Sequence, residues 1–221
     1  MAKVFLMKSQ IMKPRIGAQE VALVAMSAAI YYALAVVASV IMIIPGVTLF
    51  YYPEATAMVT VMWFGIWGAL AAWIGTILLS PFYGYGYPIG AMFGFFSFYG
   101  PLIAGIILRK LHIDLTLKDK RSFIWWILIA AVIAPAIEGA GGVLVFILEG
   151  WYTWQFAYTY GWFLWWFGEV TAVGIIGTIL MRVLSKFIMR SSLFHKGLIY
   201  RESAEEESAA SAPEGADRAV S

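Results

Sequence analysis

Two glutamates, Glu138 and Glu169, lie within stretches that are apolar enough to cross a bilayer. The segment around them, residues 122–181, contains no lysine or arginine, and neither does the segment 16–108. A carboxylate inside a bilayer costs about 2–4 kcal/mol or more, so it usually faces a cavity or a partner and marks a functional site. With no base to pair with, these acids are either protonated or available to a cation. The alternative is that each acid only hydrogen-bonds a neighbouring helix.

Aromatic residues gather in three segments between the apolar runs, and two further acids, Glu54 and Glu149, lie in or beside them. Trp and Tyr rings stack on flat ligands and attract cations, at about 0.5–2 kcal/mol per contact. The same residue types also anchor helices at membrane interfaces without binding a ligand. The candidate substrate-binding residues are the aromatic side chains of these segments and three of the acids: Tyr51, Tyr52, Glu54, Tyr83, Tyr85, Tyr87, Glu138, Trp151, Trp154 and Glu169.

The composition indicates a membrane protein. Of the 221 residues, 62% are hydrophobic and only 13% are charged, whereas soluble domains average about 25% charged residues. The formal net charge of +2 gives no reason to expect a nucleic-acid partner. The chain contains no cysteine, which excludes disulfides, thiolate metal sites and cysteine nucleophiles.

Several kinds of chemistry have no candidate residues. The only histidines, His112 and His195, are too few and too far apart to form a transition-metal site. The chain lacks the glycine-rich loop with lysine that holds ATP phosphates. No nucleophile, base and orienting group occur together. We therefore expect no enzymatic activity, no cofactor and no metal site.

The basic residues predict the topology. They cluster before the first apolar run, in the loop 109–121 and after residue 181, and such clusters stay on the cytoplasmic side. An even number of crossings must therefore separate them. The run between Pro53 and Leu79 is short for two spans, yet a single crossing there would place the loop 109–121 outside. We predict an all-α membrane protein with six transmembrane helices, both termini cytoplasmic, and a turn near Gly65 to Gly68.

Three parts make up the chain. Residues 1–15 form a cytoplasmic or interfacial N-terminal segment, and residues 16–201 form the six-helix transmembrane domain. Residues 202–221 form a disordered cytoplasmic tail, because they contain no large apolar side chain except Val220. Inside the domain, proline, glycine and tyrosine predict loops. The expected loops are 45–53, 80–88 and 149–160, and the last helix is expected to begin at Trp162 and to continue past Arg182.

The rise per residue of an α-helix gives the distance of each acid from the cytoplasmic side of the membrane. Glu138 follows the cytoplasmic Arg121 by about 25 Å of helix, and Glu169 precedes the cytoplasmic Arg182 by about 20 Å. Both acids then lie in the outer half of the membrane, and Glu54 and the aromatic segments lie at or near the outer face. A pocket on that side would contain acids and rings but no base. It would favour a small, flat ligand that is neutral or cationic, because a carboxylate or phosphate on the ligand would require arginine or lysine.

Small residues repeat along the first apolar run. Ala25, Ala29 and Ala33 are spaced four residues apart, so they lie on one face of a helix. Such a stripe allows another helix to approach closely. Packing within the same chain is the alternative, and the stripe alone does not decide which helix approaches.

Two segments resemble a known family. Residues 20–33 (EVALVAMSAAIYYA) and 62–75 (MWFGIWGALAAWIG) are similar to the first helix and the glycine-rich middle segment of the substrate-binding S components of energy-coupling factor (ECF) vitamin transporters. The resemblance covers roughly residues 16–190. It implies six helices with cytoplasmic ends, and contact between the alanine stripe and a transmembrane coupling subunit that works with an ATPase pair. It also implies that the vitamin binds near the outer face, under the loop after the first helix.

Three functions remain open from the sequence. The leading hypothesis is a multi-pass subunit of the cell membrane that captures a thiamine- or pyrimidine-like vitamin or precursor, energised by separate subunits. The first alternative is a self-contained secondary transporter in which Glu138 and Glu169 carry protons or cations, although no inverted repeat is visible. The second is a non-transporting accessory membrane subunit. Partners would be the small-molecule substrate, the coupling subunit with its ATPases, and the lipid bilayer.

Overall fold

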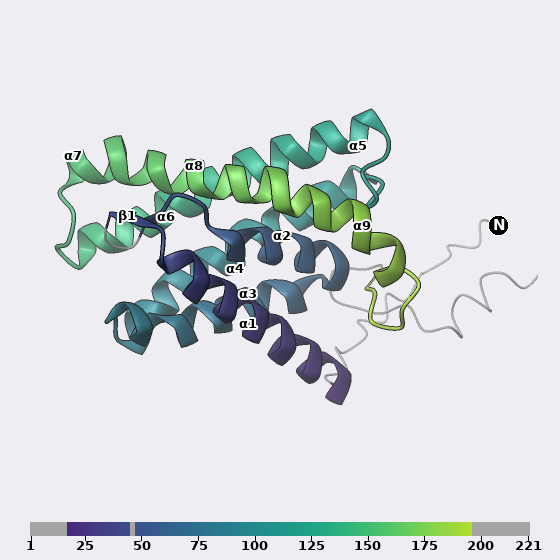
Figure 1. The fold of residues 1–221 in the computed structure, drawn as a ribbon, viewed down its shortest axis with the longest axis horizontal. Coiled ribbons are helices and arrows are strands. Elements are labelled where there is room, and N and C mark those ends of the chain that lie inside the picture. Colours follow the sequence, from purple (N-terminus) through teal and green to yellow (C-terminus); the bar gives the residue numbers. More distant parts are fainter. Residues whose placement is uncertain (1–16, 45–46, 196–221) are drawn as a thin grey trace, which may run out of the picture.

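Helices form nearly all of the described chain (Figure 1). The computed structural model describes residues 17–44 and 47–195. The N-terminal segment 1–15 and the tail 202–221, whose properties were predicted above, lie outside the described residues.

Five helical stretches in the described residues are long and apolar enough to cross a membrane. They are α1 (Ala18–Ser39); α3 (Ile66–Leu79) with the 3₁₀ helix η1 (Ser80–Tyr83); α4 (Tyr87–Lys110); α5 (Lys120–Trp125) with η2 (Trp126–Ile133) and α6 (Ala134–Leu148); and α7 (Trp154–Phe156) with η3 (Ala157–Gly161), α8 (Trp162–Ala172), η4 (Val173–Gly177) and α9 (Thr178–Ile188). The segments η2, η3 and η4 are π-helical. These stretches agree with the all-α membrane class predicted from the sequence.

A further helix, α2 (Tyr52–Phe64), has 13 residues, or about 20 Å at 1.5 Å per residue. It ends at Gly65, whose φ of 62° belongs to the left-handed region that glycine tolerates. The chain then reverses into α3, and Gly68 lies directly against the backbone of Thr60. The predicted turn is therefore confirmed at its first residue.

Arg109 completes the end of α2. Its guanidinium donates hydrogen bonds to the carbonyls of Val61 at 3.2 Å and Met62 at 2.8 Å, and to the carbonyl of His195 at 2.9 Å. The last carbonyls of a helix have no partner within the helix, so a side chain that reaches them stabilises the end. From the sequence, Arg109 was only one member of a basic loop. The structure shows that it also ties α4 to the end of α2.

All three expected loops differ in part from the structure. The segment 80–88 begins with η1 (Ser80–Tyr83) and ends in α4, which starts at Tyr87. After α1, β1 (Met42–Ile44) and β2 (Val47–Thr48), of which β2 lies within the expected loop 45–53, pair as short antiparallel strands, named the β-hairpin below. The last helical stretch begins at Trp154 rather than at the predicted Trp162, because the hydroxyl of Thr153 caps it by accepting a hydrogen bond from the Phe156 N–H at 3.3 Å. The aromatic residues 154–160 are therefore helical, and the predicted loop is shorter. The helix does continue past Arg182, as expected.

The connections separate into two ends along the long axis of the molecule. In Figure 1 the β-hairpin, η1 and the start of α7 lie towards the left, whereas the start of α1, the start of α5 and the end of α9 lie towards the right. The aromatic segments therefore share one end. The basic residues that flank α4, α5 and α9 gather at the other end, which is the distribution expected across a membrane.

Candidate functional site

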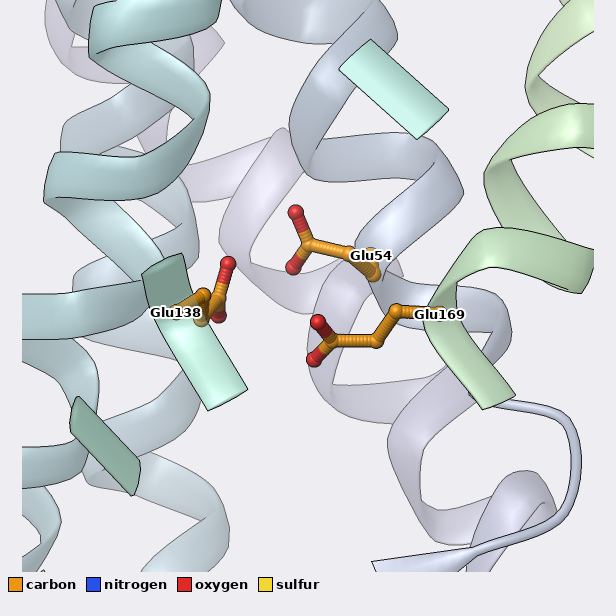
Figure 2. A group of neighbouring side chains, drawn as sticks. All are labelled: Glu54, Glu138 and Glu169. Carbon is orange, nitrogen blue, oxygen red and sulfur yellow. The ribbon is translucent and has the colours of Figure 1, made fainter. Parts of the chain in front are cut away.

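Three buried carboxylates meet between three helices. Figure 2 shows Glu54 on α2, Glu138 on α6 and Glu169 on α8 directing their side chains towards a common centre. One oxygen from each carboxylate lies within 4.8 Å of the others. The exposed fractions are 0% for Glu54, 1% for Glu138 and 0% for Glu169. These three residues are named the carboxylate cluster below.

Glu54 reaches the cluster because the chain after the hairpin crosses α8. The Tyr51 N–H donates a hydrogen bond to the carbonyl of Gly168 at 3.4 Å. Gly168 is required there, since a Cβ at that position would lie 2.6 Å from the carbonyl oxygen of Thr48. Pro53 opens α2 immediately afterwards, with Glu54 in its first turn, where a negative charge is favoured by the helix dipole. Glu54 is therefore buried inside the bundle.

Tryptophans of α8 hold that helix against the helix that carries Glu138. The indole N–H of Trp162 donates to the carbonyl of Ala136, and that of Trp166 donates to the carbonyl of Val132, each at 2.9 Å. The indole N–H of Trp165 donates to Oε1 of Glu169. Trp162 and Trp166 are four residues apart on one face of α8, so both reach the neighbouring helical stretch of η2 and α6, whereas Trp165 bonds within its own helix.

Five of the six carboxylate oxygens in the cluster have no hydrogen-bond partner among the described residues. They are both oxygens of Glu54, both of Glu138, and Oε2 of Glu169. Ser97 is a polar neighbour of Glu138, but its hydroxyl is not placed to form a hydrogen bond of good geometry. A buried carboxylate without a partner costs several kcal/mol, so the cluster requires a proton, a cation or a ligand to offset that cost.

A pocket adjoins the cluster on the side of the aromatic segments. It encloses about 610 Å³, including the part open to solvent. Glu169 and Ser97 belong both to its wall and to the surroundings of the cluster. The other lining residues are mainly rings, hydroxyls and small apolar groups: Val47, Thr48, Tyr51, Thr76, Leu79, Ser80, Tyr83, Tyr85, Gly90, Phe93, Phe146 and Trp165.

Hydroxyl groups form a chain along one wall of the pocket. Thr76 donates to the Tyr31 hydroxyl at 3.2 Å, and that hydroxyl lies 3.3 Å from the hydroxyl of Tyr51. Thr48 adds a buried Oγ1 that has no partner among the described residues. The pocket therefore offers hydrogen-bonding groups that are neutral, together with the one carboxylate of Glu169.

Aromatic rings also line the pocket. Tyr85 stacks on Trp151 with ring centroids 4.7 Å apart, and on Tyr83 at 5.8 Å. Phe93 lies parallel to Trp165 at 6.2 Å. Burial raises the pKa of Tyr85 to about 12, so its phenol stays neutral at physiological pH. A flat ring entering here would meet ring faces on the way to Glu169.

The residues proposed from the sequence separate into four groups. Tyr51, Tyr83, Tyr85 and Glu169 line the pocket, and Glu54 and Glu138 lie behind Glu169 in the cluster. Trp151 contacts the pocket through Tyr85 and is 42% exposed. The remaining three are not in the pocket wall: Tyr52, which packs on Phe50, and the outward-facing Tyr87 and Trp154.

Several lining residues had no signal in the sequence. Thr48, Thr76, Phe93, Ser97 and Phe146 are ordinary residues of apolar runs or loops, and nothing in their spacing sets them apart. Trp165 is different, because it precedes Glu169 by four residues and so shares its helix face. That spacing could have linked the two residues.

The alanine stripe of α1 lies on the outside of the bundle. Ala25, Ala29 and Ala33 are all exposed, whereas Ala28 and Ala35 on the other face are buried. The stripe is therefore not used for packing within the described part of the chain. An exposed strip of small side chains leaves the backbone of α1 open to close approach from outside.

Comparisons with protein families, curated proteins and solved structures found no match to the chain. What the site does is therefore argued from its residues. The site combines a ring-lined pocket with an acid at its inner wall and two further acids behind it. It contains the elements expected of a binding site for a small molecule.

Proposed function

We propose that the chain is a membrane-embedded substrate-capture subunit for a small ring compound. The observation that carries the proposal is the pocket at the end of the aromatic segments, in which stacked rings lead to the carboxylate of Glu169. Sites of this kind bury a ligand against apolar and aromatic walls and orient it with few polar groups. The resemblance to S components of ECF vitamin transporters supports the same function.

The lining residues favour a neutral or cationic ligand. None of them is lysine, arginine or histidine. A ligand with a carboxylate or phosphate at this depth would leave that charge unpaired, close to Glu169. A thiamine- or pyrimidine-like compound fits better, because its ring can stack on Tyr85 or Trp165 while an amino group or ring charge meets the acid.

The ligand class is tested by replacing Glu169 with glutamine. Glu169→Gln keeps the shape of the side chain and removes its charge, so affinity for a cationic ring compound should fall about 10- to 100-fold, from the loss of about 1.5–3 kcal/mol. The measurement is calorimetric titration of the purified protein with thiamine and with hydroxymethylpyrimidine. Glu149→Gln is the matched control, because Glu149 is exposed and does not line the pocket.

Binding of either compound that Glu169→Gln and Tyr85→Leu leave unchanged would place the ligand elsewhere. If Tyr85→Leu weakens binding but Glu169→Gln does not, the ligand is neutral and stacks without using the charge. No binding of any ring compound by the wild-type protein would count against a capture function.

The proposed topology has six crossings with both termini in the cytoplasm. The five long helical stretches supply five crossings, and α2 supplies the sixth, since the chain reverses at Gly65. A helix of about 20 Å is shorter than the ~30 Å hydrocarbon core. In this arrangement α2 starts below the outer surface, under the β-hairpin, which agrees with the burial of Glu54 at its first turn.

Cysteine labelling tests the topology. Single cysteines at Asp119, Glu149 and Ser208 are treated with a reagent that does not cross the membrane. Position 149 should react in intact cells, and positions 119 and 208 should react only after the cells are opened. Because Asp119 and Glu149 are both exposed, the two sites are matched in access. Labelling of position 119 from outside would contradict the even number of crossings before it.

A transport complex in the cell membrane completes the proposal. The sequence lacks the glycine-rich loop with lysine that holds ATP phosphates, so energy would come from a coupling subunit and an ATPase pair. The exposed alanine stripe is the proposed contact with the coupling subunit, and its exposure supports a surface role over internal packing. A non-transporting accessory subunit would use the same stripe but would bind no small molecule.

The carboxylate cluster favours one other function, a self-contained secondary transporter. Three acids that meet inside a bundle can exchange protons or cations as helices move. Reconstitution of the chain alone in liposomes separates the two. Substrate accumulation driven by a proton or sodium gradient would establish a secondary transporter, whereas binding without accumulation is expected of a capture subunit.

A further inference from the structure

The carboxylate cluster has the dimensions of a cation site. The nearest oxygens of Glu54, Glu138 and Glu169 lie within 4.8 Å of one another. A hard cation such as Ca²⁺ lies about 2.3–2.6 Å from each oxygen ligand. Two ligands on opposite sides of such an ion are therefore up to about 5 Å apart, and adjacent ligands are closer. The observed separations need little movement to enclose one ion.

A second observation is that the oxygens are unused. Figure 2 shows the carboxyl group of Glu54 facing those of Glu138 and Glu169. Neither oxygen of the fully buried Glu54 or of Glu138 has a hydrogen-bond partner of good geometry among the described residues, although these two carboxyls are close enough to hydrogen-bond to one another. Carboxylates with a purely structural role at full burial are normally hydrogen-bonded. The cluster keeps five oxygens free at one point, and the segments 16–108 and 122–181 contain no lysine or arginine to neutralise them.

We propose that Glu54, Glu138 and Glu169 bind one hard divalent cation of the Ca²⁺, Mg²⁺ or Mn²⁺ class, at the inner wall of the pocket. The donors are all carboxylate oxygens, which suit these ions and not the thiophilic metals. The two distant histidines and the lack of cysteine had predicted no metal site. The acids at positions 54, 138 and 169 are too far apart in the sequence to form a recognisable metal-binding motif. They come together only in the folded protein.

The surroundings of the cluster would fix the orientation of one ligand and give water access to a bound ion. Trp165 fixes Oε1 of Glu169 and leaves Oε2 free, so the orientation of this ligand is set by a neighbour. Gly100 of α4 lies against Glu138, where a Cβ would be 3.0 Å from Oε2. The adjoining pocket can supply water for the remaining coordination positions.

A bound ion would have two consequences. It would join α2, α6 and α8 through one centre, so the folded protein should become more stable as ion concentration rises. It would also leave one negative charge in excess when all three acids are ionised. The pocket would still favour neutral or cationic ligands. The ion site does not depend on the proposed capture function, because it is defined without an organic ligand.

The test uses the full chain, purified in detergent and treated with chelator. Calorimetric titration with Ca²⁺, Mg²⁺ and Mn²⁺ should show a single site for at least one of them, with a rise in the unfolding temperature. Glu54→Gln and Glu138→Gln should each weaken binding about tenfold or more, because each removes one of three charged ligands. Glu149→Gln, on the exposed loop, should bind like the wild type.

A second readout locates the ion. Tb³⁺ occupies Ca²⁺ sites and emits when a nearby tryptophan is excited, so Tb³⁺ emission should appear on binding and should be competed away by Ca²⁺. Trp165→Phe should reduce the emission, because the Trp165 indole contacts Glu169. Trp154→Phe is the matched control, since Trp154 is exposed and outside the site.

The proposal is overturned if none of the three ions binds, or if the glutamine variants bind as tightly as the wild type. The acids would then be protonated and hydrogen-bonded to one another. Folding is checked separately by the unfolding temperature in chelator, where the glutamine variants should match the wild type or exceed it. Failure of ion binding leaves the ring-compound titration unaffected, so the two proposals fail independently.

Discussion

Ala29→Leu should abolish uptake by the assembled transporter while leaving ligand binding by the isolated chain unchanged. Ala29 is exposed at the middle of the alanine stripe, so leucine fits there without disturbing the packing of α1. On the outer face, however, the larger side chain holds a partner helix away from the backbone, and close approach is what small residues permit. The measurement is uptake of labelled thiamine or hydroxymethylpyrimidine by cells that express the chain with its coupling subunits.

Ile30→Leu is the matched control on the same helix. Ile30 is 52% exposed and already bulky, so leucine changes shape but adds no volume. Uptake should be retained. If Ala29→Leu reduces ligand binding by the isolated chain as strongly as it reduces uptake, the stripe serves the fold and not a partner. If uptake survives Ala29→Leu, the partner contact lies on another surface.

Gly68→Ala should destabilise the folded chain by about 1–3 kcal/mol or more. A Cβ at Gly68 would overlap the backbone of Thr60 and Val61, and backbone atoms of a packed helix cannot turn aside as a side chain can. The hairpin of α2 and α3 would have to open, and Glu54 on α2 would leave the cluster. Thermal unfolding in detergent measures the loss, and ion or ligand binding should fall with it.

Gly174→Ala provides the comparison. Gly174 also lies in a helical segment, but the nearest atom to a Cβ there is the methyl group of Ala131 at 4.0 Å. The substitution should be neutral or slightly stabilising, because alanine is the better helix former. Equal unfolding temperatures for the two variants would contradict the close α2–α3 contact.

Much of the fold class followed from local features. A long apolar run has few alternatives to a membrane helix, because the backbone inside lipid must satisfy its own hydrogen bonds. The break at Gly65 was predictable from the sequence. The even number of crossings required a turn within the apolar run, and glycine is the residue there that most readily forms one. The exposed position of the alanine stripe could not be predicted, because the spacing describes one face and not what covers it.

Other features escaped sequence reasoning because they depend on distant partners. Arg109 caps α2 across 47 residues of chain, and nothing near Arg109 in the sequence marks it for that role. The early start of α7 at Trp154 results from the Thr153 cap, which was overlooked among the surrounding aromatic residues. The hairpin of β1 and β2 has strands of three and two residues, too short to show an alternating pattern.

The sequence alone determined that the chain is apolar and helical, and that acids without bases lie inside it, because composition and run length decide what a bilayer can hold. The tertiary structure alone decided that Glu54, Glu138 and Glu169 meet. These residues lie on three helices, and their separation depends on the glycine at 168, the indole hydrogen bonds of α8 and the reversal after α2. The Gly168 contact and the indole hydrogen bonds join segments far apart in the chain, and sequence spacing carries information only about neighbours on the same helix or strand.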